Sequence, residues 1–222
     1  MCWNADISIN TFIFSLFGLI FIYISNTYTR YKVEGFTNLL TYLFVLLVVS
    51  MQLLEFFIWK NLNNPRMNTF FSKVGFFIIF SQILLVNFLA EPIYQPYLLF
   101  FYFIFIVTFL LFKQSNPIQF KTTVAPNGHL SWEWFSLKGF EKIFLLIGFT
   151  FYIIPWLLNK NISTTLYLSV CLAIFSFFIM YMILKKDNTY GSLWCWGFNL
   201  MMIFYVVKIL LILPFCEYHG LC

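Results

Sequence analysis

The length, composition and charge of this chain place it in a membrane. It has 222 residues, 62% hydrophobic and only 9% charged, whereas a soluble domain averages about 25% charged residues. The net charge of +5 is small and spread over the connecting segments. It does not favour nucleic-acid binding and instead suggests signals that orient membrane helices. A soluble globular domain is therefore excluded, and the length predicts one polytopic domain over residues 1–222.

Seven apolar segments are candidates to cross a bilayer, which takes about 20 residues in a helix. Charged and turn-forming residues separate them, as in the asparagine-rich run 61–64 before Pro65. The predicted spans are residues 7–25, 36–59, 70–90, 97–112, 140–158, 164–184 and 190–215. The fourth is short. The predicted fold class is an all-α transmembrane bundle of seven helices.

The only long connection is the polar segment 113–139, between the fourth and fifth spans. It contains Ala-Pro-Asn-Gly at 125–128, a strong turn signal. Residues alternate in character on both sides of this turn, with the period of a β-strand. Phe120, Thr122 and Val124 fall on one face, and Leu130, Trp132 and Trp134 fall on another. We therefore expect a β-hairpin outside the bilayer, with its tryptophans at the lipid headgroups.

Lysine and arginine residues in the connections predict the orientation of the bundle. Nine lie on the side of the N-terminus and the hairpin: Lys60, Arg66, Lys73, Lys113, Lys121, Lys138, Lys142, Lys185 and Lys186. Three lie on the other side: Arg30, Lys32 and Lys160. The positive-inside rule then puts the N-terminus and hairpin in the cytoplasm and the C-terminal tail outside. There, Cys216 and Cys222 either form a disulfide or stay as thiols.

Polar side chains within the spans form one stripe on each of two helices. Gln52, Glu55 and Trp59 share a face of the second span, at about 100° per residue. A second stripe opens the seventh span, with Ser192, Cys195, Trp196 and Asn199. The two spans run in opposite directions, so both stripes lie at the hairpin end, and we expect them to face each other. A carboxylate below the membrane surface is costly, so Glu55 should face protein or water and have a partner.

This cluster has two interpretations. In the functional one, Glu55 carries a proton or binds a cation, and Gln52 and Asn199 orient it. In the structural one, the polar groups only bridge helices, at about 0.6 kcal/mol for each hydrogen bond. Glu55 then reaches the surface near Lys60 or pairs with Arg66 or Lys73.

Lys208 is a second charged residue within a span. A lysine in the seventh helix is where microbial rhodopsins bind retinal, but the acid expected one turn earlier is replaced by Phe204. Retinal is therefore disfavoured, because the charged Schiff base would lack its counter-ion. Lys208 can instead extend to the surface or pair with Glu91. His129 and His219 lie outside the spans, so no catalytic residue, metal site or cofactor is predicted.

Three stretches carry a resemblance to a known group. They are MQLLEFFIW at 51–59, NGHLSWEW at 127–134 and GSLWCWGFN at 191–199. In a seven-span frame, this set resembles uncharacterised multi-pass proteins of large DNA viruses and some protists. The resemblance implies residence in a host or virion membrane and brings no established activity.

Three hypotheses for the function remain open. One is a membrane structural or interaction protein whose hairpin docks a cytoplasmic protein through Asn127, His129, Trp132 and Trp134. The second is a small transporter or channel that uses the polar cluster. The third is a lipid-acting enzyme, although the sequence favours a protein without catalytic activity.

Overall fold

The computed structural model describes residues 4–115, 117–135, 142–160 and 163–220, and within them the predicted seven-helix architecture is confirmed. Six helices are long and apolar enough to cross a membrane, and α5 is shorter. The last helix continues from α7 through a π-helical turn at Lys208–Ile212 into α8 (Leu213–Tyr218). The other helices are α1 (Ala5–Tyr28), α2 (Leu39–Lys60), α3 (Pro65–Asn87), α4 (Gln95–Ser115), α5 (Lys142–Leu157), α6 (Thr164–Leu184) and α7 (Tyr190–Val207).

Side-chain caps determine where several of these helices begin. The side-chain oxygen of Asn64 accepts a hydrogen bond from the Met67 amide, and Pro65 occupies the first turn, where its missing N–H costs nothing. Helix α3 therefore starts five residues before the predicted span. Helix α4 also exceeds the predicted 97–112, because Pro96 is accommodated in its first turn and Lys113 in its last.

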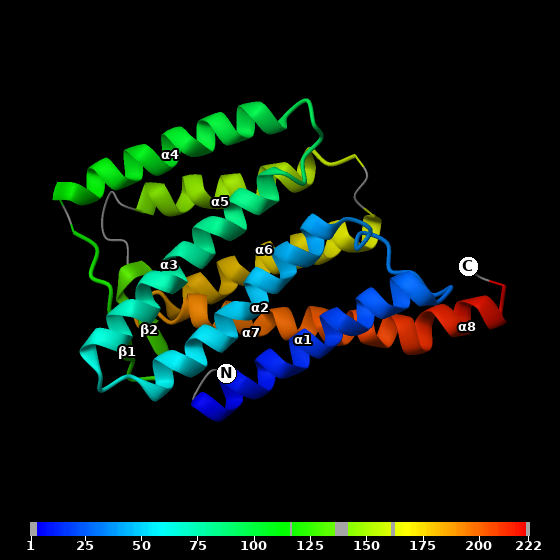
Figure 1. Cartoon of the computed structure of the whole chain (residues 1–222), viewed down its shortest axis with the longest axis horizontal. Coiled ribbons are helices and arrows are strands. Elements are labelled where there is room, and N and C mark those ends of the chain that lie inside the picture. The colour runs from blue at the N-terminus through cyan, green and yellow to red at the C-terminus, as the bar shows by residue number, and fades with distance from the viewer. Residues whose placement is uncertain (1–3, 116, 136–141, 161–162, 221–222) are drawn as a thin grey trace.

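Helix α2 lies at the centre of the bundle. It contacts α1, α3 and α7, and Figure 1 shows it running between α1 and α3. One face, with Val45 and Val48, joins a core shared with α1 and α7. The other face, with Met51 and Ile58, joins a core shared with α3, α4, α5 and the hairpin. Half of the α2 span is buried, against 33% or less in the other five candidate spans.

The predicted β-hairpin between α4 and α5 is confirmed. Strands β1 (Thr122–Val124) and β2 (Leu130–Trp132) are antiparallel, and Gly128 takes the positive φ of 79° that the turn requires. The register pairs Thr122 with Trp132 and Val124 with Leu130. Residues directly opposite each other point to the same face of a sheet. Thr122 and Val124 therefore share a face with Trp132 and Leu130, and the expectation that the two sets lie on different faces is wrong.

The hairpin is anchored to the bundle by side chains of α3. Asn68 Nδ2 donates to the carbonyl oxygen of Thr122, and Asn68 Oδ1 accepts from the Thr122 amide, both at 2.9 Å. Trp132 and Trp134 are only 2% and 4% exposed. The expectation that they lie at the headgroups is wrong, because both rings pack inside the protein. The two rings are stacked, with their centroids 5.1 Å apart. Trp134 packs against Gly75 of α3, and Trp132 packs against Gly191 of α7.

Candidate polar site within the bundle

Helices α1, α2 and α7 all contact one another, and the described polar residues predicted on α2 and α7 are buried. Gln52 and Glu55 have no exposed surface, and Ser192 and Asn199 are 1% and 5% exposed. Glu55 therefore faces neither lipid nor bulk water, and the alternative in which it reaches the membrane surface is wrong. The side chains of Trp196 and Cys195 lie outside the described part of the structure.

The two covered faces of α2 explain why a carboxylate can be buried there. Gln52 and Glu55 follow Val48 by four and seven residues, so they continue its face toward α1 and α7. The opposite face is covered by α3 and the hairpin. Gln52 and Glu55, on a covered face, therefore meet protein rather than lipid, as intramembrane ionisable groups usually do.

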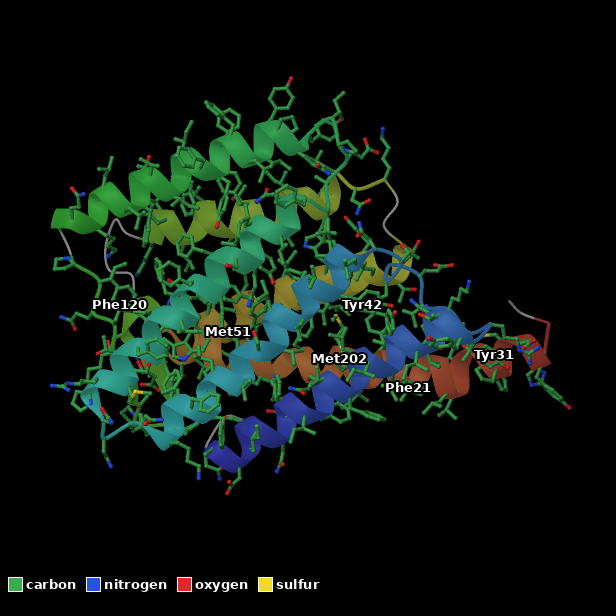
Figure 2. The ribbon with its side chains drawn as sticks, viewed as in Figure 1. Phe21, Tyr31, Tyr42, Met51, Phe120 and Met202 are labelled. Atoms are coloured by element: carbon green, nitrogen blue, oxygen red, sulfur yellow. The ribbon has the colours of Figure 1, made fainter. Side chains whose placement is uncertain are left out.

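Helix α1 supplies a wall of the site that the sequence analysis did not predict. The Ser15 hydroxyl donates a hydrogen bond of 2.5 Å to Asn199 Oδ1 of α7. Gly18, one turn further along, lets the two helices approach, because a Cβ atom there would lie only 3.4 Å from Met202 of α7. Met202 is labelled in Figure 2. The available signal was a stripe of small residues at helical spacing, Ser8, Ser15 and Gly18, all of them buried.

The chemistry of this site is that of oxygen and amide groups around one carboxyl group. Gln52, Glu55, Ser192 and Asn199 each interact with other parts of the protein. An ionised Glu55 can only accept hydrogen bonds, whereas a protonated one also donates, and the amides and hydroxyls can adapt to either form. Among the described residues, no group of three or more His, Cys, Asp or Glu side chains could hold a metal ion. The set therefore suits a proton or a weakly held, oxygen-liganded cation.

Lys208 occupies a different part of the bundle. It opens the π-helical turn after α7, and its Nζ donates to Thr165 Oγ1 of α6 at 3.2 Å. The alternative pairing with Glu91 is wrong, because Glu91 forms an ion pair with Lys160 at 3.2 Å. The Glu91 amide also donates to the carbonyl oxygen of Leu158 at 3.1 Å, which holds the two connections together.

The candidate docking residues of the hairpin are used to hold the hairpin itself. Asn127 Nδ2 donates to Thr189 Oγ1 at 3.0 Å, which ties the turn to the start of α7. His129 is 8% exposed, and burial lowers the pKa of its imidazole from the ordinary value. With Trp132 and Trp134 also buried, a partner would meet other residues of the hairpin.

The possible disulfide between Cys216 and Cys222 of the C-terminal tail stays a prediction. Cys216 is half-buried in α8, and Cys222 lies outside the described residues.

Comparison with known proteins does not identify a family for this chain. No family model, curated protein or solved structure matches the chain. The fold defines the class: a multi-pass helical membrane protein with a small β-hairpin at one end of its bundle. The resemblance to seven-span proteins of large DNA viruses and protists stays a prediction.

Proposed function

We propose that the protein is a small membrane transporter or channel that takes up a proton or a small cation at Glu55. The supporting observation is the complete burial of this carboxyl group on α2, a helix that contacts both α1 and α7. Ionisable groups are expensive inside a membrane, and they commonly mark ion or proton pathways. In this proposal Glu55 binds the ion, and Gln52 and Asn199 hold the carboxyl group in position.

The site lies near one end of the bundle, which favours exchange from that side. Glu55 precedes Lys60, at the end of α2, by five residues, or about 7.5 Å of helix rise. The hairpin packs at the same end, against α3 and α7. With the orientation that the loop charges predict, the ion would enter from the cytoplasmic side, past the hairpin.

A second candidate is an interaction protein that binds a cytoplasmic partner through the hairpin. It is supported by the part of the hairpin that remains open: Val124 is 47% exposed, and Lys121 and Pro126 are exposed beside it. In this case the polar site only ties helices together. The two candidates differ in what Glu55 does, and a flux measurement separates them.

The test uses the full-length protein in liposomes that contain a pH-sensitive dye. A potassium diffusion potential drives protons, and sodium and potassium fluxes are measured in parallel. We expect a flux that is lost in Glu55→Gln and kept in the control Glu133→Gln, which changes a glutamate of the same end of the bundle. Absence of any flux in the wild type, or an unchanged flux in Glu55→Gln, would overturn the proposal and favour the interaction protein.

A further inference from the structure

A cavity of about 100 Å³ lies on the other side of α2 from the polar site, between α3, α4, α5 and the start of α7. Met51 of α2 lines it and is labelled in Figure 2. Trp132 and Trp134 of the hairpin close one end. The wall is mostly aromatic, with Phe76, Phe80, Phe105, Phe109, Phe144 and Phe149. Gln52 and Glu55 do not line this cavity, so it is a separate site.

The cavity results from how the helices divide into two groups. Helix α5 packs on α3 and α4, whereas α6 packs on α7, and Figure 1 shows α4 and α5 along one edge of the bundle, away from α7. Aromatic rings of α5 contact rings of α6 and α7 and so connect the two groups. The ring centroids of Phe149 and Phe177 are 4.5 Å apart, and those of Tyr152 and Trp194 are 6.0 Å apart. Behind these rings, Gly148 has no side chain to fill the space.

The lining selects an apolar ligand. No charged residue contributes to the wall. The side-chain amide of Gln82, one of its few polar groups, already donates to the Leu47 carbonyl oxygen at 3.2 Å. Apolar cavities of this kind stay dry, and an engineered one of about 150 Å³ binds benzene. Hydrocarbon therefore suits the space better than water or a polar solute.

The surroundings indicate where such a ligand would come from. The cavity lies at the level of helices that cross the membrane, where lipid tails are the solvent. The cavity also lies close to the outer surface. The ring of Phe149, which lines the cavity, has its centroid 5.3 Å from that of Phe178, and Phe178 is 45% exposed. We propose that this cavity binds the hydrocarbon tail of a membrane lipid, which enters between α5 and α6.

The experiment uses the full chain in phosphatidylcholine vesicles that contain a phosphatidylcholine with a diazirine at the end of one acyl chain. After illumination, labelled residues are mapped by mass spectrometry. We expect label on Phe144, Phe149 and Ile79 of the cavity, and also on Phe100, which is 61% exposed on α4 and serves as the lipid-facing reference.

Filling the cavity distinguishes a bound tail from general contact with lipid. Gly148→Leu should remove the label from the cavity residues and leave Phe100 labelled. Gly197→Leu is the matched control, since nothing lies within 4 Å of the Cβ position there, and it should change neither. Ile79→Trp fills the same space from α3, should Gly148→Leu fail to fold.

Two results would overturn the proposal. One is label on Phe100 with none in the cavity of the wild type. The other is cavity label that persists at the wild-type level in a folded cavity-filling variant. Label in the cavity only with a sterol photoprobe, and not with the acyl probe, would also contradict a lipid tail. None of these outcomes depends on the ion flux through Glu55.

Discussion

The anchor between α3 and the hairpin leads to a quantitative prediction for Asn68→Ala. Asn68 is 4% exposed and makes two hydrogen bonds of 2.9 Å to the backbone of Thr122, which is 1% exposed. The substitution leaves a buried N–H and a buried C=O without partners. Each such group costs about 1–3 kcal/mol, and partial relaxation of the strand reduces the sum, so we expect a loss of about 2–4 kcal/mol.

Two measurements report this loss. In detergent, the thermal unfolding midpoint from tryptophan fluorescence should fall by about 4 °C or more, since 1 kcal/mol corresponds to about 2–4 °C for a chain of this size. Trypsin cleavage after the exposed Lys121 should become faster, because the strand that follows it is released. The matched control is Asn61→Ala, which removes one exposed hydrogen bond, to the Phe57 carbonyl oxygen.

The reasoning would be refuted by an Asn68→Ala variant that unfolds at the same temperature as Asn61→Ala and keeps Lys121 equally protected. In that case the hairpin would be held by its tryptophans alone, and the side-chain amide would add nothing to its attachment.

Two further predictions concern the packing and titration of the hairpin. In Gly191→Ala the new Cβ would lie 2.8 Å from the Trp132 ring, so we expect a loss of about 1–3 kcal/mol in a thermal melt, whereas Gly197→Ala, in open space, should be neutral or stabilising. Equal melting points for the two variants would contradict the close contact. Burial lowers the pKa of His129, so the unfolded chain binds a proton more readily, and stability should fall as the pH drops below about 6.5. The decline should disappear in His129→Gln and persist in His219→Gln, and a decline that survives in His129→Gln would refute the assignment.

Much of the fold could be predicted because its signals are local. Each helix is an apolar run that ends in charged or turn-forming residues, and the hairpin follows from Pro126-Asn127-Gly128 with alternating flanks. The burial of Glu55 also followed from a general rule about charges in membranes. These inferences need no knowledge of which helices are neighbours.

The contacts between distant segments could not be predicted in the same way. Periodicity shows which residues of a helix share a face, but it does not identify the partner of that face. The sequence of the first span therefore does not indicate that Ser15 binds Asn199 of α7. Likewise, the sequence does not distinguish tryptophans that lie at the lipid headgroups from tryptophans that are buried in the protein at the same level. The burial of the hairpin tryptophans and the close approach of Gly75 and Gly191 in the structure show that these rings pack inside the protein.

Ion binding at Glu55 itself tests the account most directly. Infrared difference spectra of the reconstituted protein, recorded between pH 5 and pH 9 and with sodium or potassium, should contain a carboxyl band that changes when the ion binds. This band should be absent from Glu55→Gln and unchanged in Glu133→Gln. A wild-type spectrum in which no carboxyl band depends on Glu55 across this range, with or without sodium or potassium, would contradict an ion site at Glu55.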